Sequence, residues 1–175
     1  MRACEKPSNH ITLSYCWRNA WLFTMIKYTN NVEDIVLCWH EAFGDSCEDI
    51  EFFINNAKNC RCLAYYDNEQ ICSMLYLVEC ELLGRQAQYI YAACTLEKFR
   101  NKGCMSQLLK YVQAQFGCVC LIPAENWLIE YYKNRGFTHD VSLKSLVFNQ
   151  SDEIVDYLFD GCSLEQPFAL CYVRN

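Results

Sequence analysis

Proline, glycine and histidine are scarce in this sequence, with three, six and three residues among 175. So little proline and glycine excludes a collagen-like or low-complexity chain. No continuous apolar run reaches the roughly 18 residues that a membrane-spanning helix needs, and the N-terminus lacks the charged-then-apolar form of a signal peptide. Apolar residues make up 53% of the chain. We therefore expect one domain with a buried core and no membrane partner.

Basic side chains are also few, since 15 Lys and Arg stand against 21 Asp and Glu, for a net charge of −6. Residues 1–24 hold more basic than acidic side chains, so the remainder carries 12 basic and 20 acidic ones, a net charge of −8. This balance disfavours a nucleic-acid backbone as partner and favours a cationic one.

Cysteine, in contrast, is abundant, with 14 residues. No two of them have the Cys-x-x-Cys spacing, and histidine ligands are scarce, so no metal site is predicted. Cys60/Cys62 and Cys118/Cys120 are same-face pairs in strand-like runs, where free thiols are usually buried. Reduced structural cysteines indicate a cytoplasmic protein; a redox or metal role is the alternative.

Residues 89–109 contain an apolar strand-like run, a short basic turn with Gly103, and a helix whose apolar residues share one face. The first amides of that helix, from about Asn101 to Ser106, have no intrahelical acceptor and lie at the positive end of the dipole. A pyrophosphate would fit there. An ordinary strand-to-helix turn is the alternative.

Residues 118–137 repeat the order of strand, break and helix, with Pro123 at the break and Gly136 at the helix end. Together the two segments resemble the GNAT superfamily of acyl-CoA N-acyltransferases. Its Arg/Gln-x-x-Gly-x-Gly/Ala turn corresponds to residues 100–105, and its aromatic-Tyr-x-x-x-Gly-Phe helix end corresponds to residues 131–137. Two departures are Met105 in place of Gly or Ala, and Glu125 in place of the Asn that often begins the later helix.

The resemblance implies an α/β (α+β) fold with a mostly antiparallel mixed central sheet, a splay between its two middle strands, and helices on both faces. Residues 25–175 would form the acyltransferase domain, and residues 1–24 an extension of uncertain status. Expected strands start at Met25 and cover residues 60–66, 71–80, 141–148 and 168–173, besides those of the two motif segments. Expected helices follow Asn31 and Ser46 and cover residues 152–159.

The resemblance also assigns the cofactor site. The strand before the turn would pair its backbone with the pantetheine arm of coenzyme A, and the turn would hold the pyrophosphate. The residues at these positions are Ala93, Cys94 and Thr95 on the strand, and Asn101, Lys102, Gly103, Cys104, Met105 and Ser106 on the turn.

Tyr132 matches the family tyrosine that protonates the departing thiolate, a role suited to a phenol of pKa about 10 against about 8.5 for a thiol. Its alternative role is ring packing alone. Cys104 at a helix start is a candidate nucleophile, but direct transfer needs none, so we expect a small filler there. The general base is not determined; Glu79 and Glu81, and Tyr89 or Tyr91 through water, are candidates.

These patterns predict an N-acetyltransferase that moves an acetyl group directly from acetyl-CoA to a primary amine of a small molecule or peptide. We expect no metal and no nucleic-acid partner, and a homodimer is left open. The rival hypothesis is a non-catalytic acyl-CoA-binding or regulatory module, which Met105 and the undetermined base favour slightly.

Overall fold

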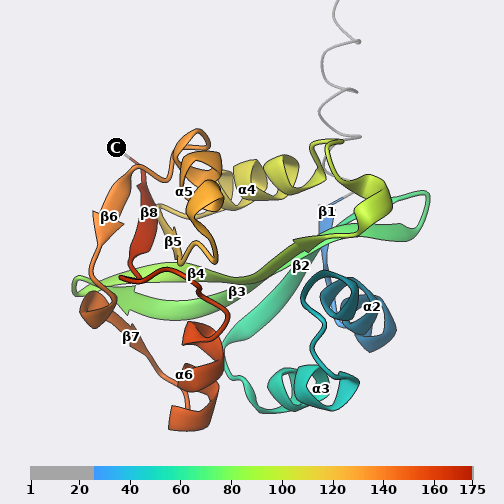
Figure 1. The fold of residues 1–175 in the computed structure, drawn as a ribbon, viewed down its shortest axis with the longest axis horizontal. Coiled ribbons are helices and arrows are strands. Elements are labelled where there is room, and N and C mark those ends of the chain that lie inside the picture. Colours follow the sequence, from blue (N-terminus) through green and yellow to red (C-terminus); the bar gives the residue numbers. More distant parts are fainter. Residues whose placement is uncertain (1–25, 175) are drawn as a thin grey trace, which may run out of the picture.

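The computed structural model describes residues 26–174 (Figure 1). The prediction of an N-terminal extension over residues 1–24 lies outside the described residues. The helices and strands, in chain order, are β1 (Ile26–Thr29), α2 (Val32–Phe43), α3 (Cys47–Asn56), β2 (Cys60–Asp67), β3 (Gln70–Leu82), β4 (Arg85–Thr95), α4 (Cys104–Gln115), β5 (Cys118–Leu121), α5 (Asn126–Lys133), β6 (His139–Val141), β7 (Leu146–Phe148), α6 (Asp152–Phe159) and β8 (Ala169–Val173).

One sheet of eight strands in the described part of the chain follows the order β1-β2-β3-β4-β5-β8-β6, with β7 paired to β3. The pairs are antiparallel except for β4 and β5, which are parallel. This confirms the predicted mostly antiparallel mixed sheet.

The parallel strands β4 and β5 meet only at Gln88 with Val119 and at Tyr89 with Cys120. Strand β4 nevertheless continues to Thr95. The two middle strands therefore diverge after Tyr89, and we call the opening between them the splay. Its presence confirms the predicted separation of the middle strands.

A β-bulge lies at the mouth of the splay. Ala92 has φ 47°, a left-handed value that is uncommon for a residue with a Cβ. The register between β3 and β4 shifts at the same place, between Met74 and Tyr76 of β3. Since a bulge bends its strand and increases the local twist, it turns the end of β4 away from β5.

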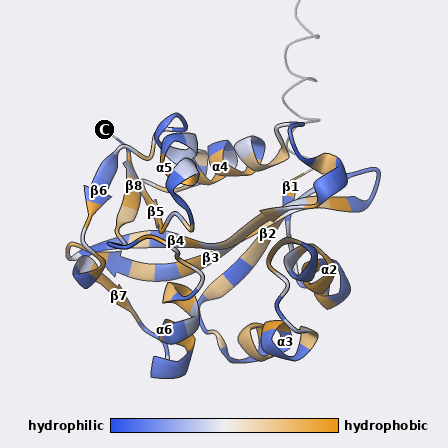
Figure 2. Cartoon of the chain, in the orientation of Figure 1, coloured by the Kyte–Doolittle hydropathy of each residue, from blue (hydrophilic) through white to orange (hydrophobic). Residues whose placement is uncertain are grey.

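Helices cover both faces of the sheet, as predicted (Figure 1). Leu75 and Leu77 of β3 belong to the core under α4 and α5, whereas Tyr76 and Val78 belong to the core on the side of α2, α3 and α6. The alternation follows from the period of two of a strand buried on both faces. Apolar and polar residues alternate along the helices (Figure 2), and the buried residues of α2 and α4 are apolar.

The predicted helix boundaries on the N-terminal half are confirmed. The Asn31 side chain accepts hydrogen bonds from the amides of Glu33 and Asp34 at the start of α2, and Gly44 ends that helix in a left-handed conformation, φ 79°. The Ser46 hydroxyl accepts from the amide of Asp49 and caps α3. These caps fix the loop of residues 44–46, which includes Asp45.

The prediction of one strand over residues 141–148 was wrong. Strand β6 ends at Val141 and pairs with β8, while β7 begins at Leu146 and pairs with β3. Between them Ser142 accepts from the amide of Lys144 and begins a short 3-10 turn. The apolar run is therefore continuous in sequence, but tertiary pairing divides it between two different partner strands, β8 and β3.

No helix among residues 26–174 is long and apolar enough to cross a membrane.

Candidate functional site

The turn before α4 offers free backbone donors. Asn101 and Gly103 have φ 61° and 81°, and Gly103 occupies the N-cap of α4 without a side-chain cap. The amides of residues 101–106 donate no backbone hydrogen bond within the described part of the chain. Unpaired amides at a helix start, beside Arg100 and Lys102, are groups that could hold an anion. We call residues 101–106 the amide turn.

Two residues of the amide turn point inward rather than over it. Met105 is half-buried and packs against the core under α4 and α5. Cys104 is 6% exposed, and burial raises its pKa above the ordinary thiol value despite the nearby Lys102. A buried thiol with a raised pKa is a poor nucleophile, which agrees with the filler role expected for Cys104.

The end of β4 presents its free edge to the splay. The amide of Leu96 donates to the Cys72 carbonyl, and the Cys94 carbonyl accepts from the Ser73 hydroxyl at 2.8 Å, so these backbone groups face β3. Since successive residues of a strand direct their backbone groups to opposite edges, those of Ala93 and Thr95 face the splay. The Thr95 carbonyl accepts from Arg100 Nε at 3.3 Å.

Of the three predicted strand contacts, Ala93 and Thr95 therefore have the orientation that a ligand strand requires. Cys94 does not have this orientation, because its carbonyl accepts a hydrogen bond from Ser73 and its sulfur lies 3.5 Å from that of Cys38 in the core.

Tyr132 projects from α5 and is 7% exposed. Its ring contacts those of Tyr131 and Phe137, with centroid distances of 5.2 and 6.0 Å. Within residues 26–174, no hydrogen bond engages its hydroxyl. The hydroxyl is not a fully buried atom without a partner, a class to which only Gln88 Oε1 belongs among these residues, so it is accessible from the surface. Burial raises the pKa of Tyr132, with Arg135 opposing the rise. The phenol thus stays protonated and has a free donor.

Tyr91 occupies the opposite face of the sheet, one residue before the bulge. Its ring packs against those of Trp39 and Phe53, with centroid distances of 5.4 and 5.0 Å. Burial raises the pKa of Tyr91, and the nearby carboxylates of Asp45 and Asp160 add to the rise. Trp39 Nε1 donates to Asp45 Oδ2 at 2.7 Å and so orients that carboxylate.

Helix α6 contributes further acidic groups beside Tyr91. A hollow of about 530 Å³ is lined by Glu153, Asp156, Tyr157, Phe159 and Asp160. The Tyr157 hydroxyl lies 3.5 Å from Asp49 Oδ1. We call the set Asp45, Asp49, Glu153, Asp156 and Asp160 the acidic mouth. The single ion pair found among the described residues joins Lys133 and Asp140, so no cation of this part of the chain pairs with the acidic mouth.

The acidic mouth was missed by sequence reasoning, because its members come from the α2–α3 loop, α3 and α6 and share no spacing. The excess of acidic residues was the only signal in the sequence.

The candidate bases differ in position. Glu79 and Glu81 pair with Gln88 and Gln86, where β4 and β5 have not yet diverged, and both are exposed. The Tyr89 hydroxyl donates to the Leu158 carbonyl at 2.8 Å in the core. Tyr91 is therefore the candidate that lies at the splay.

Within the described residues no group of three or more His, Cys, Asp or Glu side chains could hold a metal ion. The cysteines described there are free thiols. Several lie in sulfur–sulfur contact, such as Cys38 with Cys94 and Cys118 with Cys171, at 3.5 and 3.7 Å.

A family model of the acetyltransferase (GNAT) domain matches residues 27–139. The chain therefore belongs to the GNAT acetyltransferase family, as the two sequence motifs predicted. No curated protein sequence matches it.

Solved structures share the fold at low sequence identity. An acetyltransferase from Bacillus subtilis in complex with CoA is 11% identical with a TM-score of 0.58, and the match covers 86% of this chain and 98% of that one. A GNAT family acetyltransferase from Elizabethkingia anophelis with acetyl-CoA bound is 15% identical with a TM-score of 0.57, covering 85% and 96%. A probable N-acyltransferase from Enterococcus faecalis is 14% identical with a TM-score of 0.49, and 62% of this chain spans only 31% of it.

Proposed function

We propose that this protein is an N-acetyltransferase that transfers an acetyl group directly from acetyl-CoA to a primary amine. The observation that carries the proposal is the free hydroxyl of Tyr132, a residue that is 7% exposed and whose hydroxyl makes no hydrogen bond in the described part of the chain. Family membership and the free donors of the amide turn support it.

Each residue would have a defined task in the transfer. The amide turn would bind the pyrophosphate of acetyl-CoA, and Ala93 and Thr95 would pair with the extended pantetheine arm. A backbone amide that faces the splay would donate to the thioester oxygen as negative charge develops there. The amine nitrogen forms its bond to the carbonyl carbon, the carbon–sulfur bond breaks, and Tyr132 gives its proton to the departing sulfur.

The acceptor would approach from the face of Tyr91, and we propose that it is a cationic amine. The acidic mouth attracts positive charge, and the half-buried rings of Tyr91 and Tyr157 would provide a surface on which an ammonium group can lie. Tyr91 would orient a water molecule that carries the amine proton to the carboxylates of Asp45 or Asp160. The proposed acceptor is a small molecule or peptide, and the proposed setting is the cytoplasm.

One argument for the rival hypothesis, a non-catalytic acyl-CoA-binding module, was Met105 in place of Gly or Ala, and this argument is weakened. Met105 packs into the core and does not cover the amide turn, so the departure from the family pattern at this position leaves the donors accessible.

The test is release of free thiol from acetyl-CoA in the presence of polyamines, aminoglycosides, amino acids and N-terminal peptides. We expect turnover with acceptors that carry at least one further positive charge. Tight acetyl-CoA binding without turnover on any amine would favour the non-catalytic module instead. Absence of acetyl-CoA binding would reject both hypotheses.

A further inference from the structure

Arg135 is held rigidly between α4 and α5. Its backbone carbonyl accepts from Gln113 Nε2 at 2.6 Å. Its Nε donates to the Ser106 hydroxyl at 3.0 Å, and its Nη1 donates to the Tyr131 carbonyl at 2.7 Å. The guanidinium carbon lies 3.5 Å from the centroid of the Tyr131 ring. The positive charge is therefore fixed next to the first turn of α4, to which Ser106 belongs.

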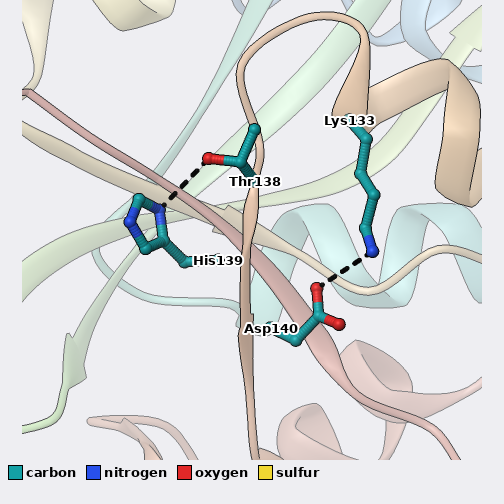
Figure 3. Close-up of polar contacts among 4 residues, drawn as sticks. All are labelled: Lys133, Thr138, His139 and Asp140. Atoms are coloured by element: carbon teal, nitrogen blue, oxygen red, sulfur yellow. Dashed lines mark hydrogen bonds and ion pairs between the residues drawn. The ribbon is translucent and has the colours of Figure 1, made fainter.

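This position is electrostatically unfavourable for a cation in isolation. The N-terminus of a helix carries about half a positive charge, which attracts anions and repels guanidinium groups. Lys133, near the end of α5, has a carboxylate partner in Asp140 at 3.5 Å (Figure 3). No described carboxylate lies within 4 Å of Arg135. A bound anion would compensate both positive charges, that of Arg135 and that of the α4 N-terminus.

The Arg135 guanidinium also has N–H donors that its two hydrogen bonds do not use. It has five N–H groups, and the bonds to Ser106 and Tyr131 use two of them. The side chain is half-buried, so the remaining donors can reach a ligand that lies over the amide turn. Guanidinium groups suit phosphate because they can donate two parallel hydrogen bonds to it.

We infer that Arg135 is a phosphate-binding residue of the cofactor site, which contacts coenzyme A together with the amide turn. The inference rests on the proposed function for the identity of the ligand. Ser106 and Tyr131 hold the guanidinium in place and act as positioning residues. The phosphate is either the pyrophosphate or the 3′-phosphate of coenzyme A, which share the same chemistry.

The test compares binding of CoA, dephospho-CoA and pantetheine to the full chain and to Arg135→Gln by calorimetry. We expect the Kd for CoA to rise about tenfold, as for loss of one charge-assisted hydrogen bond, and the Kd for pantetheine to stay unchanged. An equal rise with dephospho-CoA assigns the contact to the pyrophosphate. A rise restricted to CoA assigns it to the 3′-phosphate.

Two further variants control for structure and for charge. Lys133→Gln removes a neighbouring positive charge that has its own partner, and we expect it to bind CoA as the parent does. Arg135→Lys keeps the charge and should recover part of the affinity, with a melting temperature near that of the parent.

Unchanged CoA affinity in folded Arg135→Gln would overturn the inference, and so would an equal loss of affinity for pantetheine. A parent protein that binds CoA without any turnover would count against the proposed catalysis alone. A parent that binds no CoA would refute both.

Discussion

The two faces of the sheet differ in charge at the splay. On the α4 and α5 face, the amide turn, Arg100, Lys102 and Arg135 present donors and positive charge. On the opposite face, the acidic mouth presents carboxylates, and Tyr91 and Tyr157 present half-buried aromatic rings. Strand β4 serves both faces, since Ala93 and Tyr91 lie on either side of one bulge.

This difference indicates a division of labour around a single bulge. An anionic donor and a cationic acceptor would approach the same opening from opposite sides, each attracted by charge of the opposite sign. Neither attraction needs a metal or a covalent intermediate to bring the two reactants together.

The largest effect is expected for Tyr132→Phe, which deletes the hydroxyl and keeps the ring. Turnover should fall by about 10²-fold, the usual size of a general-acid contribution, while the Kd for acetyl-CoA and the melting temperature change little. Steady-state kinetics and calorimetry measure both. Tyr131→Phe, which removes the adjacent hydroxyl but keeps the ring beneath Arg135, is the control. Parent-like turnover in Tyr132→Phe would make this tyrosine structural.

A smaller effect is expected for Gly103→Val on the cationic face. Gly103 has φ 81°, which a β-branched residue adopts only with strain, so the amide turn should lose its shape. Affinity for CoA should fall at least tenfold, or about 1.4 kcal/mol.

The matched control for this variant is Gly84→Val, at φ 75° in the β3–β4 hairpin. It carries the same backbone strain at the end of β4 remote from the splay. CoA affinity that falls equally in both variants would show a general loss of structure rather than a local site.

On the acidic face, Asp45→Asn keeps an oxygen for Trp39 Nε1 and removes the charge. Because Asp45 is exposed, we expect an increase of only about fivefold in KM for a cationic amine, near the 1 kcal/mol limit of an exposed ion pair. The effect should shrink at high salt. Glu51→Gln, an exposed change of the same charge on α3, should leave KM unaltered. If KM for acetyl-CoA rose instead, the assignment of the two faces would be reversed.

Alkaline pH should lower the stability of the whole domain rather than of one face, because the buried thiols lie on strands of the sheet that both faces share. Burial raises the pKa of Cys72 to about 11 and that of Cys171 to about 12, against about 8.5 for an unfolded thiol. The unfolded chain loses these protons first, so the stabilisation is complete below about pH 8.5 and is lost as pH rises towards 12.

Urea unfolding at pH 7.5 and at pH 10 tests this dependence, and we expect a lower midpoint at pH 10. An unchanged or higher midpoint would show that the thiols are not held protonated in the folded state.

The sequence by itself determined the family, the order of most elements and the amide turn. These features depend on local causes: the apolar period of α4, the Asn31 and Ser46 caps, and a glycine where the backbone needs a positive φ. The prediction that amides 101–106 are free followed from helix geometry alone. The sites named for Tyr132, Ala93 and Thr95 came from the family resemblance and stay predictions.

Only the tertiary structure decided which side chains meet. It divided the run of residues 141–148 between two different partner strands, engaged the Cys94 carbonyl with Ser73, and brought Asp45 and Asp160 to Tyr91. It also placed Arg135 beside Ser106, 29 residues earlier in the chain. Long-range pairing depends on the whole packed sheet, and no spacing within one segment encodes it.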